Sequence, residues 1–254
     1  ILRAYNDIKR ASTRERRMLL VSKNIIGRTD WDKRVTRVLA PNSTYYHGDE
    51  IIRKSFYIKK WDKKSFGNPI KIVTVMSDGL YKGLETIVNT AIELKKTKAI
   101  NFIWIVVGQN ETGDFPKIVR RWLKIDYIAL NIELVGLKSE EELSDILAES
   151  DMYCQVSHIE NSPNSVCEAM LVGTPIVASF AGGTDSLLEN KKQGILYQDG
   201  DPYSCAGAIL EISSNFKNAI SYSTNARESA SNRHDPVRIV DKLIETYQLI
   251  VNDI

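Results

Sequence analysis

The residues best suited to chemistry lie in one loop and the helix expected to follow it, within residues 158–170. This helix is predicted to begin at Pro163, because proline is favoured at the first helical position and the polar residues before it can cap the helix. The backbone N–H groups that follow, at Asn164 and Ser165, carry the positive end of the helix dipole. Such a helix start binds a phosphate without a cationic side chain.

Two carboxylates flank this helix start. Glu160 precedes it, and Glu168 lies about one turn inside it. Carboxylates repel phosphate but accept hydrogen bonds from hydroxyls, such as those of a ribose and a sugar. The competing interpretation is that Glu160 is solvated and Glu168 only complements the helix dipole. The neighbourhood favours a ligand site. Gly173 stands at the expected C-cap of the helix, and the glycines of 181–184, after the next strand, let the backbone approach a ligand closely.

A second loop, residues 77–83, contributes the cation Lys82. A single lysine in a loop is usually solvated, so this signal is weak by itself. In a parallel sheet, however, the loops that follow the strands share one edge, where ligands bind. Lys82 then lies on the same edge as Asn164 and Glu168.

Other chemistries find less support. The Asp-x-Asp triplets at 30–32 and 199–201 are better explained as helix starts than as metal ligands. The histidines (His47, His158 and His234) are scattered, and neither a metal-ligand set nor a Ser-His-Asp or Cys-His pairing is indicated. We therefore expect neither a metal nor a cofactor.

The elements that position these loops alternate between strand-like and helix-like from residue 70 onward. Short apolar runs predict strands at 71–76, 102–107, 132–135, 152–156, 175–178 and 195–197. Helices are predicted between them, for example where apolar residues recur at helical spacing from Leu84 to Ile92. The fold class is therefore α/β, with a doubly wound, Rossmann-like parallel sheet.

The N-terminal part does not continue this alternation. Residues 1–56 offer only a strand at 18–26, a helix at 31–39 and an extended piece at 45–46, which indicates the remnant of another domain. The Lys-rich segment 57–68 is predicted to be a linker, and residues 69–254 a complete domain. The last helix, near 236–250, is expected to pack back toward the N-terminal part.

Charge is unevenly distributed along the chain. Residues 1–64 hold 17 Lys and Arg against 7 Asp and Glu, whereas residues 65–254 hold 17 against 25. The basic stretch at 10–17 has few aromatic neighbours, so an anionic membrane surface is a better partner than nucleic acid. A solvated helix face is an equally good interpretation.

Length and composition fit a globular protein. The chain has 254 residues, of which 43% are hydrophobic and 26% charged. No apolar run reaches the ~18–20 residues that cross a bilayer, and no signal peptide opens the sequence. Three cysteines do not make a disulfide framework. We expect a cytoplasmic protein, peripheral at the inner membrane face if the basic part binds lipid, and the C-terminal piece of something longer.

Together these residues resemble the C-terminal half of retaining glycosyltransferases of family 4, which have the GT-B fold. In that family a Glu is followed by Pro, a second Glu eight residues after the first, Ala-Met and Gly-Thr-Pro. The matching residues are Glu160, Pro163, Glu168, Ala169-Met170 and Gly173-Thr174-Pro175. Further matches are Lys82-Gly83, Gly182-Gly183, Gly194-Ile195-Leu196 and the segment 199–202.

The resemblance implies a role for each candidate residue. Glu160 is expected to contact hydroxyls of the transferred sugar, and Glu168 the ribose of a nucleotide sugar. The amides of Asn164 and Ser165, with Lys82, are expected to hold the diphosphate and stabilise the leaving group.

The resemblance further places Leu137 near the nucleotide base and implies retention of configuration without an obligatory metal. Ser77 stands where the family usually has an arginine, so the phosphate grip is expected to be weaker here or completed from elsewhere. Most of the family's N-terminal acceptor domain is absent from the sequence. This chain is therefore expected to bind a nucleotide sugar but not to transfer it alone.

The acceptor implied is a saccharide or a lipid-linked acceptor in the synthesis of a surface polysaccharide or glycolipid. Two alternatives stay open. One is a nucleotide-sugar epimerase on the same fold, and the other is a non-catalytic partner that binds nucleotide sugars. The sequence does not identify the nucleotide, the sugar or the linkage.

Overall fold

The computed structural model describes residues 2–252, with the side chains of residues 5–252. The chain folds into two compact units. We call Ile52–Arg233 the sheet unit, and Ile1–Ile51 with His234–Ile254 the terminal unit.

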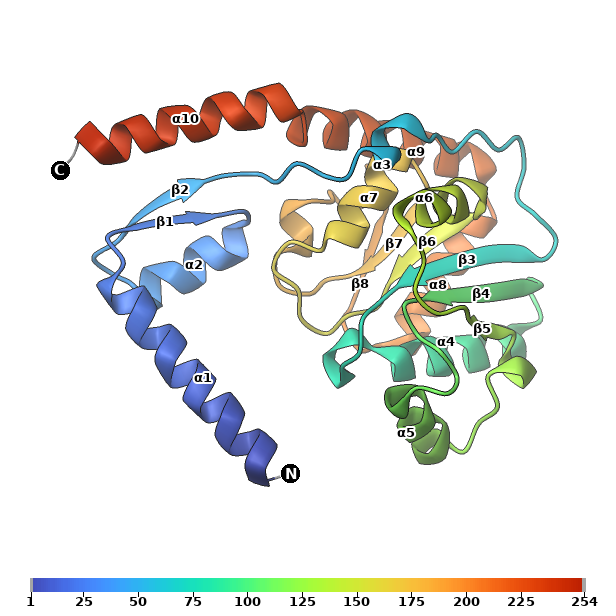
Figure 1. Ribbon diagram of the computed structural model, residues 1–254. Coiled ribbons are helices and arrows are strands. Elements are labelled where there is room, and N and C mark those ends of the chain that lie inside the picture. The colour runs from blue at the N-terminus through green and yellow to red at the C-terminus, as the bar shows by residue number, and fades with distance from the viewer. Residues whose placement is uncertain (1, 253–254) are drawn as a thin grey trace. The chain divides into compact units, whose positions relative to one another are not determined.

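The sheet unit contains, within the described residues, a six-stranded sheet in the order β5-β4-β3-β6-β7-β8 (Figure 1). Every neighbouring pair of strands is parallel. The strands are β3 (Ile70–Val75), β4 (Phe102–Val107), β5 (Ile132–Leu134), β6 (Met152–Gln155), β7 (Ile176–Ser179) and β8 (Ile195–Tyr197). The apolar runs in the sequence place each strand within one residue of these bounds, so the predicted parallel sheet is confirmed.

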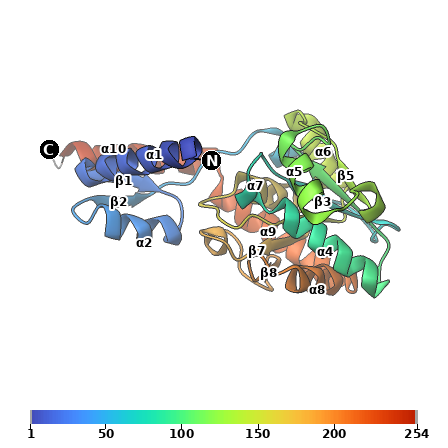
Figure 2. The ribbon, with the colours of Figure 1, turned by 90° about the horizontal axis from the view of Figure 1, so that it is seen from below.

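Helices cover both faces of this sheet (Figure 2). They are α3 (Ser55–Ile58), α4 (Leu84–Thr97), α5 (Asp114–Leu123), α6 (Glu140–Glu149), α7 (Asn164–Val172), α8 (Pro202–Ser213) and α9 (Phe216–Arg233). One core joins α4, α5 and α8 to Ile72 and Trp104, and the other joins α3, α6 and α7 to Val73 and Tyr153. The two cores separate because successive side chains of a strand point to opposite faces.

The segment 57–68, expected to be a linker, belongs to the sheet unit. Trp61 is buried, and its indole Nε1 donates to the carbonyl of Ser150 at 2.8 Å. Lys63 forms an ion pair with Asp151, whose side chain is fully buried. The many lysines conceal these anchors in the sequence, and the unit begins at Ile52.

The terminal unit differs from expectation at its first element. Instead of a strand at 18–26, the structure has a helix, α1 (Leu2–Val21), followed by the short strand β1 (Asn24–Gly27). A short apolar run such as Met18–Val21 is compatible with either a helix or a strand. Here it forms the last turn of the helix.

The rest of the terminal unit follows the sequence pattern. The expected helix is α2 (Asp30–Leu39), which begins with a capping box between Thr29 and Asp32. The expected extended piece is β2 (Thr44–His47), which pairs in parallel with β1. The last helix, α10 (Pro236–Asn252), is grouped with these elements, and His234 just before it bonds to the carbonyl of Glu50 at 2.7 Å.

Candidate functional site

The carboxyl edge of the sheet, where the strands end, carries the candidate residues. Along the sheet the chain order reverses between β3 and β6, which are neighbours. In sheets of this kind a ligand binds where the order reverses. Lys82 lies in the loop after β3 and Glu160 in the loop after β6, so the topology brings these two residues together.

Lys82 and Glu160 form an ion pair at this reversal. The lysine Nζ lies 2.6 Å from Oε1 of the glutamate, and the two side chains are only 18% and 16% exposed. Gly83 allows the lysine loop to lie close to β6. Its φ is +77°, and a Cβ there would lie 2.1 Å from the carbonyl oxygen of Val156.

The turn at Gly182 and Gly183 positions the loop of Glu160. The Gly183 N–H donates to the carbonyl oxygen of Glu160 at 3.0 Å. Gly182 has φ +56°, and a Cβ there would lie 1.7 Å from that same oxygen. The glycines were expected to admit a ligand, whereas the structure uses them to admit the backbone of Glu160.

The helix after this loop, α7, begins at Asn164 with Pro163 as its N-cap, one residue later than expected. Proline has no side-chain hydrogen-bonding group, so this N-cap residue makes no side-chain hydrogen bond to the helix. The N–H groups of Val166 and Cys167 donate to the carbonyl of Pro163. The N–H groups of Asn164 and Ser165 lie before these two in the chain. They belong to the positive start of the helix, which attracts a phosphate.

Glu168 is buried inside α7, with 7% of its side chain exposed. Nη2 of Arg53 donates to its Oε1 at 2.6 Å, and Nε of Arg53 donates to the same oxygen at 3.2 Å. The guanidinium of Arg53 also lies 4.9 Å from the centre of the Phe56 ring. No pattern in the sequence pointed to Arg53, because it is one of several basic residues in its segment and lies far from Glu168 along the chain.

The negative charges of both carboxylates act on Tyr153 of β6. Its buried hydroxyl donates to Oγ of Ser165 at 2.8 Å. Burial raises the pKa of Tyr153, and the negative charges of Glu160 and Glu168 raise it further. Both carboxylates therefore act on one phenol beside the start of α7.

Ser77 and Leu137 occupy more open positions on the same edge. Ser77 follows β3 and is exposed, and Leu137 follows β5 with 88% of its surface exposed. β4 lies between these two strands. The strand before Leu137, β5, is therefore separated from β3 by one strand.

His158 is a site residue that the sequence did not reveal. Its ring bonds to Glu85 and Asp199, which belong to two other segments of the carboxyl edge. The two aspartates of the segment 199–201 therefore have different partners. Asp199 bonds to His158, and Asp201 caps α8 as expected. Across residues 2–252, no group of three or more His, Cys, Asp and Glu side chains could hold a metal ion.

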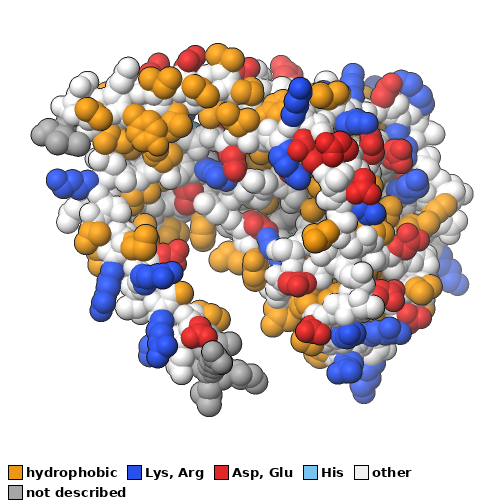
Figure 3. Space-filling view, viewed as in Figure 1, with side chains coloured by type: hydrophobic (Ala, Val, Ile, Leu, Met, Phe, Trp, Pro, Cys, Tyr) orange, Lys and Arg blue, Asp and Glu red, His pale blue; other side chains and the backbone are white. Residues whose placement is uncertain are grey.

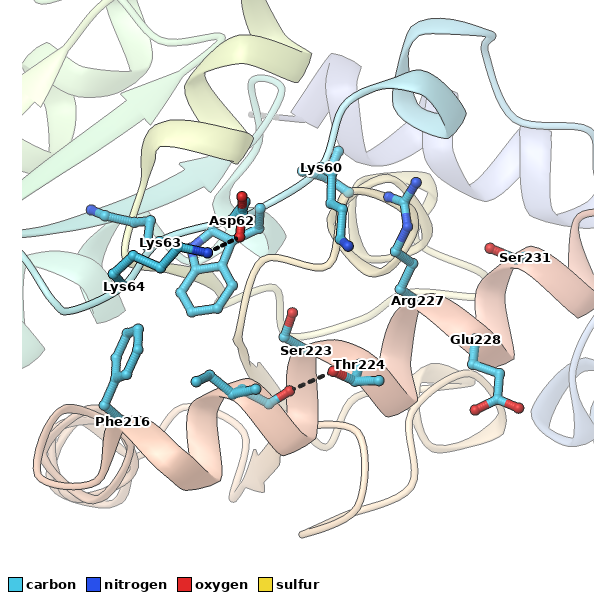
Figure 4. A pocket seen from close by; sticks show the side chains of 13 residues that line it. Lys60, Asp62, Lys63, Lys64, Phe216, Ser223, Thr224, Arg227, Glu228 and Ser231 are labelled. Atoms are coloured by element: carbon cyan, nitrogen blue, oxygen red, sulfur yellow. Dashed lines mark hydrogen bonds and ion pairs between the residues drawn. The ribbon is translucent and has the colours of Figure 1, made fainter.

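A groove of about 570 Å³ lies elsewhere on the sheet unit, between the segment 60–64 and α9 (Figure 4). Its most prominent cation, Arg227, donates to the carbonyls of Tyr57 and Lys59 at 3.0 and 2.8 Å, and also to that of Leu171. These bonds fasten the segment before β3 to the unit. The guanidinium is therefore committed to backbone oxygens.

The chain is similar to known proteins in family, sequence and fold. Residues 56–229 match the family of glycosyl transferases group 1. An uncharacterized glycosyltransferase of Methanocaldococcus jannaschii is 28% identical over 82% of this chain and 52% of its own length. The amylovoran biosynthesis glycosyltransferase of Erwinia amylovora is 26% identical over 70% of this chain and 45% of its own. The chain thus spans about half the length of these relatives.

Two solved structures show the same fold. Sucrose-phosphate synthase from Thermosynechococcus elongatus has a TM-score of 0.76 at 18% identity, covering 94% of this chain and 61% of that one. The Anabaena protein HepE, solved in complex with UDP, has a TM-score of 0.75 at 19% identity, covering 89% and 64%. Both similarities extend over most of the described residues.

Proposed function

Since this chain belongs to the glycosyl transferases group 1 family, we propose that it is the donor-binding part of a retaining glycosyltransferase of family 4. The donor is a nucleotide-diphosphate sugar, and the acceptor is a saccharide or a lipid-linked acceptor. The observation that carries this proposal is the Lys82–Glu160 ion pair beside the open start of α7. There a cation, free amides and a carboxylate meet at the reversal of strand order.

The proposed roles divide the donor into three parts. Lys82 and the amides of Asn164 and Ser165 bind the diphosphate, and they stabilise the charge that develops on it as the bond to the sugar breaks. Glu160 accepts hydrogen bonds from hydroxyls of the transferred sugar. Glu168 accepts them from the ribose.

Two exposed residues have peripheral roles in this proposal. Ser77 lines the diphosphate side, and Leu137 lies near the base. The reaction retains the configuration of the sugar and needs no obligatory metal. The cation that the family usually carries at position 77 is missing, which makes Lys82 the principal positive side chain at the leaving group.

The chain is proposed to be inactive without further N-terminal structure. The aligned part of this chain covers 52% and 45% of the length of the first two relatives, so about half of each relative has no counterpart here. The terminal unit is interpreted as a remnant of the acceptor domain. Donor binding without transfer is therefore the expected behaviour of these 254 residues.

The names of several relatives support a role in making surface polysaccharides. One is an amylovoran biosynthesis glycosyltransferase, and another is a putative colanic acid biosynthesis glycosyltransferase of Salmonella typhimurium. A third, from Escherichia coli, is named for transfer from UDP-Gal to a diphosphoundecaprenol-linked acceptor. We assign this chain to the same broad class of synthesis.

Peripheral contact with the anionic inner membrane face belongs to the same proposal. No helix within residues 2–252 has the length and apolar character needed to cross a bilayer. Exposed basic residues of α1, including Arg10, Arg14 and Arg17, supply positive charge. Exposed apolar residues line α10, among them Val237, Ile244 and Tyr247 (Figure 3).

Calorimetry with UDP-, GDP- and ADP-sugars tests the donor assignment. We expect one nucleotide series to bind and to raise the melting temperature, because a ligand that binds only the folded state stabilises it. Glu168→Ala should abolish that response, whereas Glu189→Gln, which alters an exposed ion pair with Lys192, should preserve it. Release of an epimerised sugar nucleotide in the absence of acceptor would instead support the epimerase.

A further inference from the structure

His158 connects three segments of the carboxyl edge. Nδ1 of its ring lies 2.8 Å from Oδ1 of Asp199, in the turn after β8, and Nε2 lies 2.5 Å from Oε1 of Glu85, near the start of α4. Its backbone N–H donates to the carbonyl oxygen of Tyr81 at 2.8 Å. Gly200 lies beside the ring, and a Cβ there would be 3.6 Å from Cε1.

Both ring nitrogens lie within hydrogen-bond distance of carboxylate oxygens, and a doubly protonated ring donates to both of them. A neutral imidazole has one donor and one acceptor, so one of its lone pairs would point at a carboxylate. The environment of Glu85 is consistent with a positive charge on the ring. Its Oε2 is buried and has no hydrogen-bond partner among the residues that the structure describes, and buried carboxylates are usually paired with a positive group.

The charged groups around His158 agree with this protonation. Burial disfavours the charged ring, but the hydrogen bonds and negative charges of Glu85 and Asp199 outweigh it, so the pKa of His158 is raised. Lys82, next to Tyr81, and Glu160, two residues after His158, are paired with each other. The imidazolium is thus shared between one carboxylate of α4 and one of the β8–α8 turn.

The position of His158 links it to both members of that pair. Its backbone bond goes to Tyr81, the residue before Lys82, and His158 itself lies two residues before Glu160. We propose that His158, as an imidazolium ion bound between Glu85 and Asp199, is a positioning residue that holds Lys82 and Glu160 in the arrangement that binds the donor. This inference rests on the proposed function, and it concerns the placement of Lys82 and Glu160 rather than a contact between His158 and the donor.

Amide hydrogen exchange tests the structural part of the inference in the full chain without any ligand. After correction for the intrinsic rate, exchange in segments 77–83 and 158–162 should speed up by about tenfold as the pH rises through the His158 titration. His158→Gln should exchange at the fast rate at every pH, and Glu189→Gln should behave as the parent. Equal protection of these segments in the parent and His158→Gln at all pH values would overturn the inference.

Imidazole NMR provides a second variant if His158→Gln fails to fold. Asp199→Asn removes one of the two carboxylates, so the midpoint of the His158 titration should move to lower pH. Glu189→Gln should leave it in place. An unchanged midpoint in Asp199→Asn would also overturn the inference.

Binding of UDP or the responding nucleotide diphosphate then separates the two proposals. The parent should bind about tenfold more weakly above the His158 titration than below it, and His158→Gln should bind weakly at every pH. No binding by the parent at any pH contradicts the proposed function, and the exchange experiment still decides the structural role. Binding that is equally strong in the parent and His158→Gln contradicts the positioning role alone.

Discussion

Arg53 and Glu168 lie 115 residues apart in the chain, yet the Arg53 guanidinium is 2.6 Å from the buried carboxylate of Glu168. The arginine side chain is 47% exposed, whereas that of the glutamate is 7% exposed. The pair therefore keeps an ionised carboxylate inside α7 at the proposed ribose position. It also anchors the first residues of the sheet unit to the candidate site.

Removal of the Arg53 charge should destabilise the sheet unit. We expect Arg53→Gln to lower the free energy of unfolding by about 1–2 kcal/mol, since a nearly buried carboxylate loses its cation while the exposed arginine gains little from the pair. Urea unfolding measures this loss. Lys59→Gln, which breaks a more exposed ion pair with Asp145, should cost less.

The double variant Arg53→Gln/Glu168→Gln checks the cause of that loss. A neutral side chain at 168 no longer needs a cation, so most of the stability should return. A double variant as unstable as the sum of the two single variants would contradict the assigned role of the pair.

The charge of Lys82 should matter for the diphosphate rather than for the nucleoside. Lys82→Gln is expected to weaken binding of the nucleotide diphosphate by about tenfold to a hundredfold, because a charge-assisted hydrogen bond is lost. Binding of the corresponding nucleoside should change little. Calorimetry with both ligands measures the difference, and an equal loss for both would place Lys82 away from the phosphates.

Gly182 should be intolerant of a side chain. Gly182→Ala puts a Cβ 1.7 Å from the carbonyl oxygen of Glu160. It also places an alanine at φ +56°, a backbone conformation that favours glycine. We expect a loss of at least about 1–3 kcal/mol in unfolding free energy, together with weaker donor binding. Gly207→Ala is the matched control, because it lies on the exposed face of α8 with nothing within 4 Å of the added atom.

The control variant Gly207→Ala should change the free energy of unfolding in the opposite direction. An alanine in a helix interior is favoured over glycine by about 0.5–1 kcal/mol, so Gly207→Ala should stabilise the protein. Thermal unfolding of the two variants shows both effects. Similar stability changes in both would mean that the Gly182 turn is not constrained as described.

The stability of the protein should depend on pH through His158. Its folded-state pKa lies above the unfolded value of about 6.5, because the bonds to Glu85 and Asp199 outweigh the opposing effect of burial. The stability that protonated His158 adds to the fold is therefore fully present below the pKa of the unfolded state. It is lost as the pH rises through the pKa of the folded state. The difference in unfolding free energy between the parent and His158→Gln should shrink over that range. A difference that is constant with pH would exclude the titration of His158 as its cause.

The sheet could be predicted from the sequence because each buried strand is a short apolar run with a clear boundary. The start of α7 was misplaced by one residue, since Pro163 serves as N-cap rather than as the first helical residue. The first helix was missed because Met18–Val21 is too short to show which periodicity applies. Local patterns identify elements well but their ends less well.

The candidate site could be predicted only in part. Lys82 was expected on the same edge as Asn164 and Glu168, because parallel strands end together, and in the structure it forms an ion pair with Glu160 at that edge. Arg53 and His158 were missed because their partners are distant in the sequence and their side chains form no local motif. Trp61 was missed for a related reason, since the lysines around it predict exposure.

The backbone bond between Gly183 and Glu160 has a consequence for engineering this protein. The two loops are built as one piece, because the carbonyl of one fills the space left by the missing side chain of the other. A graft intended to alter which sugar is accepted must therefore carry residues 158–163 and 180–184 together. Transplanting either loop alone leaves a mismatched contact at Glu160, the carboxylate proposed to bind the sugar.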